Sequence, residues 1–388
     1  MLSMQGKPLD IRETCLGKIT WTERPVLSRR NYIYVSQKLD KKVRFYAGVI
    51  SSHEVLSGRQ WGRIPAIYGV RPERLKLLKD NDIVLLEPNG NVNLVWDRDS
   101  QHNSILATQD CNCRCIMCPQ PRQKDPKGFL DFNLKLINLL DPSRTHRIGI
   151  TGGEPTLLGD GLFRLISACK KRVPKASITL LTNGRAFKDL LLVKKLADLD
   201  HPDLCLCIPL YADNDKEHDR IMGTKGSFYE TIEGLTNLAL FTQKIEVRTV
   251  LHSMTYKRLP QFADFVYRNF PFVVHVAFMG LEATGLALKN LKTIWIDPVE
   301  YQSQLKCAVK SLHRRAMNVS VYNLQLCVIP KELWRFSRKS ISSWKNIYIE
   351  QCKECDFVNE CAGFFETSRD WHSRHIHPLK REDQAKRI

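Results

Sequence analysis

Thirteen cysteines occur in the 388-residue chain, and three of them stand close together with a spacing typical of metal ligands. Cys111, Cys115 and Cys118 form a C-x3-C-x2-C pattern, which lets three thiolates meet at one metal centre from a single loop. Three sulfur ligands suit an iron–sulfur cluster that keeps one iron free for another molecule. They also suit zinc, for which Cys113 would add a fourth thiolate. The spacing favours the iron–sulfur centre and leaves Cys113 outside it.

A second group of cysteines lies toward the C-terminal end of the sequence. It consists of Cys327, Cys352, Cys355 and Cys361. Four thiolates close a site around one zinc ion or one four-iron cluster, and the spacing does not choose between the two.

Composition and charge predict a cytoplasmic protein with reduced thiols. Hydrophobic residues make up 43% of the chain, yet no uncharged apolar stretch approaches the roughly 20 residues that span a bilayer. The N-terminus lacks the apolar region of a secretory signal, and a large chain with an odd cysteine count is not a typical disulfide scaffold. The net charge of +18 would attract an anionic partner, but the scattered basic residues disfavour nucleic acid, and we expect no membrane partner.

From about residue 104 the sequence alternates short β-rich runs with helical patterns, which predicts an α/β fold with a parallel sheet over residues 104–300. Six such units could form an open doubly wound sheet or a partial barrel. Residues 1–103 are predicted to be a β-rich module that includes a strand over 43–50, and residues 301–388 a cysteine-rich region. The six runs are Ser104–Gln109, Arg147–Thr151, Ser177–Thr182, Leu204–Leu210, Ile245–Leu251 and Val273–Met279.

Turn and helix signals divide these segments further. Asn89-Gly90 between two apolar runs predicts a hairpin. Ser227 and Glu230 have the spacing of a capping box at the start of a helix over 227–241. Asp297-Pro298 predicts another helix start.

Reactive groups of a parallel α/β fold collect in the loops after the strands, and several loops here carry suitable residues. The cysteine loop follows the first run, and Gly152-Gly153-Glu154 follows the second. Paired glycines let a backbone approach a ligand, and a carboxylate can accept a hydrogen bond from an ammonium group. Asn183-Gly184, after the third run, is either a ligand contact or an ordinary turn. Arg248 on the fifth run would bind an anion or form an ion pair, and Gly280–Glu282 after the sixth is a pocket candidate.

The cysteine loop and the Gly-Gly-Glu loop, in this order, resemble the radical S-adenosylmethionine (SAM) superfamily. The resemblance implies a partial (β/α)6 barrel in which Cys111, Cys115 and Cys118 hold a [4Fe–4S] cluster that binds SAM. It implies that Gly152-Gly153-Glu154 holds the methionine amino group of SAM.

Other segments carry the resemblance further. Asn183 would lie near SAM, and Arg248 is a further candidate cofactor contact. The loop 213–220 resembles a D-x4-H-D loop of peptide-modifying members, although Pro209 or Leu210 stands where those members often carry a serine. The C-terminal cysteines resemble SPASM and twitch regions, which implies a second, auxiliary [4Fe–4S] cluster. We expect Trp334 and Trp344, each near basic residues, to pack over it rather than to bind RNA.

Several longer stretches resemble one narrower family, the His-Xaa-Ser system radical SAM maturases of the HxsC type. This resemblance implies post-translational modification of a small His-Xaa-Ser repeat peptide, a companion radical SAM protein (HxsB-like) and an electron donor. The alternatives are a radical SAM enzyme acting on RNA or a small molecule, and a zinc-binding adaptor without activity. The matching stretches are Thr108–Asn112, Met117–Pro121, Thr151–Gly159, Met279–Gly285, Tyr322–Cys327 and Ser340–Asn346.

Overall fold

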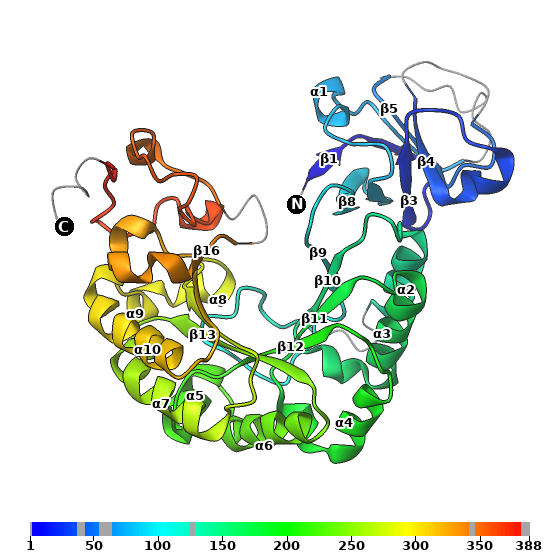
Figure 1. Cartoon of the computed structure of the whole chain (residues 1–388). Helices are drawn as coiled ribbons and strands as arrows, with labels where there is room; N and C mark the ends of the chain where they lie inside the picture. The colour runs from blue at the N-terminus through cyan, green and yellow to red at the C-terminus, as the bar shows by residue number, and fades with distance from the viewer. Residues whose placement is uncertain (1, 37–42, 54–63, 125–128, 341–345, 382–388) are drawn as a thin grey trace. The chain divides into compact units, whose positions relative to one another are not determined.

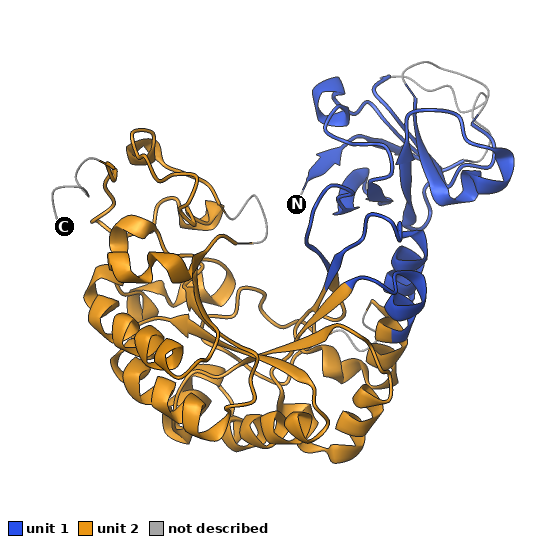
Figure 2. Ribbon diagram, viewed as in Figure 1, with its two compact units in different colours: residues 1–104, 131–148, 167–176 blue, residues 105–130, 149–166, 177–388 orange. Residues whose placement is uncertain are grey.

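The chain divides into two compact units (Figure 2). The computed structural model describes residues 2–36, 43–53, 64–124, 129–340 and 346–381. Unit 1 comprises residues 1–104, 131–148 and 167–176, and unit 2 comprises residues 105–130, 149–166 and 177–388.

The sheet of unit 1 has both of its edges covered by one short N-terminal segment. The strand order is β1-β8-β7-β3-β4-β5-β6-β2, so β1 and β2 stand at opposite ends. Only Gly6 separates these two strands in sequence, and they pair antiparallel with β8 and β6. This segment therefore removes both edges at once. The strands are β1 (Ser3–Gln5), β2 (Lys7–Leu9), β3 (Cys15–Thr20), β4 (Tyr32–Ser36), β5 (Gly48–Ser51), β6 (Ala66–Tyr68), β7 (Ile83–Leu86) and β8 (Asn91–Trp96).

The core of unit 1 consists of aliphatic side chains that project from neighbouring strands to the same side of the sheet. Ile19, Ile33, Ile50 and Ile67 are fully buried, one on each of β3 to β6. The predicted hairpin is confirmed, because β7 and β8 pair antiparallel around Asn89-Gly90. The predicted strand over 43–50 is wrong in its first half: Phe45 has a φ of 73°, which is incompatible with an extended chain, and β5 begins at Gly48.

Replacing Gly6 by alanine is expected to destabilise unit 1 by about 1–3 kcal/mol. A Cβ atom at Gly6 would lie 2.5 Å from the carbonyl oxygen of Tyr68, so the corner between β1 and β2 would have to move. Urea unfolding followed by circular dichroism measures the effect. Gln5→Ala, at an exposed neighbouring position, is the control and should change the free energy of unfolding by much less. Equal stability of Gly6→Ala and the unmodified chain would show that the corner is dispensable.

The second sheet runs in one direction through the chain, from β9 to β16, in sequence order (Figure 1). The printed registers from β11 to β16 are all parallel. A doubly wound sheet reverses its strand order at one point, and this order contains no reversal, so the partial-barrel winding is the one observed. The strands are β9 (Asn103–Leu106), β10 (Arg147–Thr151), β11 (Ser177–Leu181), β12 (Leu204–Pro209), β13 (Lys244–Leu251), β14 (His275–Gly280), β15 (Val319–Tyr322) and β16 (Ser337–Arg338).

Helices connect these strands, and none in the described ranges is long and apolar enough to cross a membrane. The α-helices are α1 (Pro72–Leu75), α2 (Leu130–Leu139), α3 (Asp160–Arg172), α4 (Leu190–Ala197), α5 (Asp215–Met222), α6 (Ser227–Leu240), α7 (Leu259–Asn269), α8 (Gly285–Lys289), α9 (Leu291–Ile294) and α10 (Gln302–Arg314).

Both predicted helix starts are confirmed, since α6 begins at Ser227 and a helix follows Asp297-Pro298. Asp297 accepts a hydrogen bond from the backbone of Val299 and so caps the 3-10 helix η5 (Pro298–Tyr301) that precedes α10. The capping box at α6 is wrong. The Ser227 hydroxyl donates to Asp219 instead, and Glu230 binds Arg185, because these partners from neighbouring segments compete with the local cap.

The fully buried His252 makes the stability of the fold depend on pH. Burial lowers its pKa to about 4, whereas an unfolded histidine titrates near 6.5. The neutral ring is therefore favoured in the fold, and its contribution is present above pH 6.5 and lost as the pH falls toward 4. We expect the free energy of unfolding, measured in urea, to be lower at pH 4.5 than at pH 7. Up to about 3 kcal/mol of this difference should come from His252.

A non-titrating replacement isolates that contribution. His252 Nδ1 accepts a hydrogen bond from the backbone of Met254, and an asparagine oxygen can accept from the same position two residues on. His252→Asn should therefore show a flatter stability profile between pH 7 and pH 4.5. An unchanged profile would assign the acid sensitivity to other groups.

Candidate functional site

The first cysteine loop lies after β9 and is fastened to α5 by its backbone. The amides of Arg114 and Ile116 donate to the carbonyls of Met222 and Ile221, at 2.9 and 3.0 Å. Gly223, with a φ of 62°, follows α5, and a side chain there would overlap the carbonyl oxygen of Arg114. The loop 111–118 thus lies against the C-terminal end of α5, about one hundred residues further along the sequence.

The opposite side of the loop is held by the start of α8. Gly285 lies against the carbonyls of Cys118 and Pro119 with no room for a Cβ atom, and the amide of Leu286 donates to Cys118 at 2.8 Å. Asn290 adds a side-chain hydrogen bond to the carbonyl of Ile116 at 2.7 Å. Backbone contacts on two sides therefore fix the path of this loop.

The three predicted ligand sulfurs are partly buried in this loop. A hydrogen bond with Cys113, and then burial, raise the pKa of Cys111, whereas burial is the main cause for Cys115 and Cys118. The Sγ atom of Cys115 contacts the Met222 sulfur at 3.5 Å, and Cys118 donates to the carbonyl of Gln120 at 2.9 Å. In the described part of the chain no three His, Cys, Asp or Glu side chains are gathered as a metal-ion site. The donor set is nonetheless the one that an iron–sulfur cluster takes.

Cys113 contacts Cys111 on one side and the loop after β11 on the other. Its sulfur accepts hydrogen bonds from Asn183 Nδ2 and Arg185 Nη1, each at 3.4 Å. Asn183 also donates to the side chain of Asn112 at 2.6 Å. Asn183, which we predicted to lie near the cofactor, therefore lies directly against the cysteine loop.

The Gly-Gly-Glu loop packs backbone to backbone against the same segment. The amides of Gly153 and Glu154 donate to the carbonyls of Thr108 and Asp110, at 2.8 and 2.7 Å. Side chains at Gly152 and Gly153 would overlap those two carbonyl groups. This contact explains why the sequence has two glycines at this position: only hydrogen allows the two loops to touch.

Glu154 is fully buried and joins two loops. One carboxylate oxygen accepts hydrogen bonds from Thr156 and from the Thr182 hydroxyl, and the other accepts from the amide of Asn183 at 2.6 Å. Burial raises its pKa, and these hydrogen bonds oppose that effect. The carboxylate thus braces the loops after β10 and β11, and its role in holding SAM stays a prediction.

The remaining predicted contacts are engaged with protein partners. Arg248 lies midway along β13 and binds Glu246 through Nε at 2.5 Å. In the loop 213–220, Asp213 forms two hydrogen bonds with Arg258, and His218 is fully buried. Asp219 accepts from two backbone amides at the start of α6, Gly226 and Phe228. This loop therefore shapes the chain between β12 and α6.

The cysteines of the second group come from short segments that follow β15, and some of them interact electrostatically. The charges of Cys361 and Cys352 both act on Cys327, whose pKa burial raises to about 11. Backbone amides of Leu326 and Gly363 donate to the sulfur of Cys361 at 3.5 Å. Such amide-to-sulfur hydrogen bonds are typical of cysteines that ligate a cluster.

Trp334 lies beside this group. Its indole donates to the carbonyl of Leu326 at 3.0 Å, and its ring packs edge-on against Phe357. The side chain is thus used in packing next to Cys327, in line with the expected cover of the auxiliary site. Trp344 and most of the stretch 340–346 lie outside the described residues.

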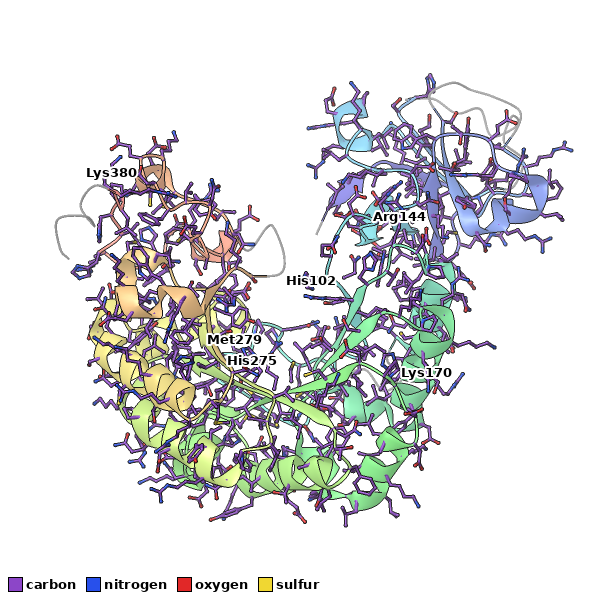
Figure 3. All side chains as sticks on the ribbon, viewed as in Figure 1. His102, Arg144, Lys170, His275, Met279 and Lys380 are labelled. Atoms are coloured by element: carbon purple, nitrogen blue, oxygen red, sulfur yellow. The ribbon has the colours of Figure 1, made fainter. Side chains whose placement is uncertain are left out.

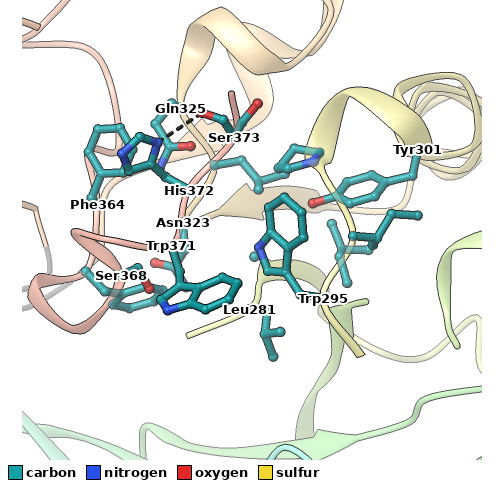
Figure 4. Close-up of a pocket in the computed structure, with 16 residues that line it drawn as sticks. Leu281, Trp295, Tyr301, Asn323, Gln325, Phe364, Ser368, Trp371, His372 and Ser373 are labelled. Carbon is teal, nitrogen blue, oxygen red and sulfur yellow. Dashed lines mark hydrogen bonds between the residues drawn. The ribbon is translucent and has the colours of Figure 1, made fainter. Parts of the chain in front are cut away.

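A pocket lies at the C-terminal ends of β13, β14 and β15 (Figure 4). Gly280 and Leu281, predicted as pocket residues, line it together with Trp295 and Trp371. Asn323 Oδ1 also faces it, and within the described residues this buried oxygen has no hydrogen-bond partner. The pocket therefore combines aromatic walls with one orphaned acceptor at the end of the sheet where the cysteine loop lies.

Sequence comparisons match part of this chain to known proteins. A sequence profile described as the Radical SAM superfamily matches residues 105–266. A GTP 3′,8-cyclase of Petrotoga mobilis is 26% identical over 216 residues, which are 52% of this chain and 65% of that protein. A GTP 3′,8-cyclase of Desulforamulus reducens is 26% identical over 49% of this chain and 58% of its own length. The chain thus spans less than two thirds of these curated relatives.

Two solved structures are similar at low identity. Streptococcus suis SuiB bound to S-adenosylmethionine has a TM-score of 0.49 at 18% identity, covering 60% of this chain and 53% of SuiB. Native anSMEcpe with bound AdoMet has a TM-score of 0.47 at 16% identity, covering 74% of this chain and 94% of that one. From the profile match and the two loops, residues 105–266 form a radical SAM superfamily domain.

Proposed function

We propose that this chain is a radical SAM enzyme that modifies a peptide. The observation that carries the proposal is the direct backbone contact between the cysteine loop segment and the Gly-Gly-Glu loop. Gly153 and Glu154 donate to the carbonyls of Thr108 and Asp110, immediately before Cys111. Two motifs 40 residues apart in sequence thus form one surface at the C-terminal edge of the sheet, where parallel α/β proteins bind their ligands.

The residues of this surface have separate roles in the proposal. Cys111, Cys115 and Cys118 would hold a [4Fe–4S] cluster, and Asn183 and the glycine backbone would border SAM. When bound, the cluster would supply one-electron reduction of SAM, the chemistry needed to remove hydrogen from an unreactive C–H bond. Because raised pKa values keep the thiols protonated, loading the site must release protons.

The second cysteine group belongs to the same proposal as an auxiliary [4Fe–4S] site. Cys327, Cys352, Cys355 and Cys361 supply four thiolates, so such a cluster would be fully ligated. Full ligation suits electron transfer or structural support rather than direct contact with the substrate. The electron donor would act from solution.

The proposed substrate is a small peptide with His-Xaa-Ser repeats, modified together with a companion radical SAM protein in the cytoplasm. The pocket at β13 to β15 supports a peptide, because its aromatic walls suit a side chain and Asn323 offers an acceptor for a donor group. Peptide maturation is further supported by the resemblance of stretches such as Thr151–Gly159 and Tyr322–Cys327 to the His-Xaa-Ser maturases.

A small-molecule substrate is the second candidate. The curated relatives named above are GTP 3′,8-cyclases, and the net charge of +18 would favour an anionic nucleotide. This candidate keeps the SAM-cleaving site and changes only the molecule from which hydrogen is removed.

One experiment separates these candidates. Protein purified without oxygen is reconstituted with iron and sulfide, reduced with dithionite and given SAM with either a synthetic His-Xaa-Ser repeat peptide or GTP. We expect 5′-deoxyadenosine in both mixtures and a mass change in the peptide alone. Conversion of GTP would select the second candidate, and protein that holds zinc but no iron would refute both.

A further inference from the structure

A second group of reactive side chains lies on β13, β14 and β15. Side chains alternate along β13, where Ile245 and Val247 are fully buried and Glu246 and Arg248 are partly exposed. The exposed series belongs to the face of the sheet opposite helices α6, α7 and α10 (Figure 1). His275 projects from the same face (Figure 3).

Three side chains on these neighbouring strands form a continuous hydrogen-bond chain. Oε2 of Glu246 lies 2.8 Å from Nδ1 of His275, and Nε2 of His275 lies 2.9 Å from Oγ of Ser320. The chain thus runs from a carboxylate through an imidazole to a hydroxyl. Base and hydroxyl within hydrogen-bond distance, with a third group orienting the base, are the geometric signature of an activated nucleophile.

The charges around Glu246 fix the protonation of this chain. Burial alone would raise its pKa, but the hydrogen bond with His275 and the charge of Arg248 outweigh that effect and lower it to about 2. The ionised carboxylate can only accept a hydrogen bond, so the proton of His275 sits on Nδ1. With that tautomer, a neutral His275 presents the lone pair of Nε2 to Ser320, as a base must.

A small residue separates the hydroxyl from a guanidinium group on this face. In the strand register Arg248 stands opposite Ala277, and Ala277 opposite Ser320, so all three lie in one row on the same face. Strands are about 4.8 Å apart, so the backbones at Arg248 and Ser320 are roughly 10 Å apart, with the methyl group of Ala277 on the strand between them. Nε of Arg248 binds Glu246, which holds the guanidinium on the same face. Its positive charge suits the negative charge that develops when a carbonyl is attacked.

We propose that Ser320 is a nucleophile that accepts an acyl group from a carboxylic ester, with His275 as its base and Glu246 as the residue that orients the base. Ser320 Oγ bonds to the ester carbonyl carbon while its proton passes to His275 Nε2. The C–O bond to the alcohol then breaks, and the alcohol leaves with that proton. Water, deprotonated by His275, releases the carboxylic acid and restores Ser320. Because Ser320 is only 5% exposed, a slim acyl chain is expected.

Covalent labelling tests the proposal without SAM, iron or a known substrate. The full chain is treated with an alkyl fluorophosphonate, which phosphonylates activated serines and releases fluoride. We expect one adduct per chain, located on Ser320 by peptide mass spectrometry, and none in Ser320→Ala. Ser303→Ala, at an exposed serine on α10, is the matched control and should be labelled as fast as the unmodified chain.

Variants of the histidine distinguish activation from a merely structural network. His275→Ala should slow labelling of Ser320 by about 100-fold or more, and added imidazole should restore much of the rate. Circular dichroism must show both variants folded, and His275→Gln replaces His275→Ala if the latter is not. A rate independent of His275, an adduct on other residues, or no adduct on folded protein would overturn the proposal. Because the labelling needs neither SAM nor iron, its failure is distinguishable from a failure of SAM cleavage.

Discussion

Cys115→Ala is expected to abolish the formation of 5′-deoxyadenosine from SAM. Cys115 is the middle sulfur of the C-x3-C-x2-C loop and lies against Met222, where backbone hydrogen bonds fix the loop. Without it, Cys111 and Cys118 alone cannot hold a [4Fe–4S] cluster with a single free iron. Reduced, reconstituted protein is incubated with SAM, and 5′-deoxyadenosine is measured by chromatography.

Cys307→Ala is the matched control for this loss. Cys307 is exposed on α10 and belongs to neither cysteine group, so its removal should leave the rate unchanged. Iron analysis of Cys115→Ala adds a second test, because the C-terminal group should keep its own cluster, roughly half of the total iron. Full turnover by Cys115→Ala would reject the assignment of the first group, and complete loss of iron would reject the auxiliary site.

Gly153→Ala is expected to lower the rate of SAM cleavage by about 100-fold while leaving the iron content unchanged. A methyl group at this position would overlap the carbonyl of Asp110, so the loop after β10 would have to move away from the segment that leads into Cys111. A displacement of about 1 Å between groups that must act together can cost this factor. The measurement is the single-turnover rate of 5′-deoxyadenosine formation at saturating SAM.

The control for this variant is a glycine with open space around it. Gly226, which precedes α6, has a φ of 80° and a ψ of −1°, and no atom lies within 4 Å of the position that a Cβ atom would take. Gly226→Asn keeps this left-handed backbone accessible, since asparagine tolerates it, and should leave the rate close to that of the unmodified chain. Equal activity of Gly153→Ala would mean that contact between the two loops is not needed for cleavage.

The sequence was sufficient to predict six of the eight strands of the second sheet and the loops that follow them. All six β runs correspond to strands, and Arg147–Thr151 matches β10 residue for residue. Runs rich in β-branched residues alternate with helical patterns, so each element can be recognised from its own local sequence. The positions of the loops then follow from the order of the strands. From the sequence, the loops that contain Gly153 and Asp110 could be expected only to lie near each other. Whether their backbones touch depends on how far each loop extends beyond the end of the sheet.

Features that depend on long-range register were beyond sequence reasoning. Glu246, His275 and Ser320 are 29 and 45 residues apart, and they meet only because β13, β14 and β15 pair in one register. Arg248 was a candidate from the sequence, but its partner Glu246 was not. The available signal was that Glu246 and Arg248 stand two residues apart on one strand, which places them on the same face of the sheet. Similarly, the capping box at Ser227 failed because Asp219, from another segment, competes for its hydroxyl.

The double pairing of the first nine residues has a practical consequence for handling the protein. Proteolytic trimming of this stretch would uncover two rows of unsatisfied backbone groups simultaneously, on β8 and on β6. Uncovered strands of this kind recruit strands from other molecules, so trimmed material should self-associate. Affinity tags and their cleavage sites are therefore better attached at the opposite terminus.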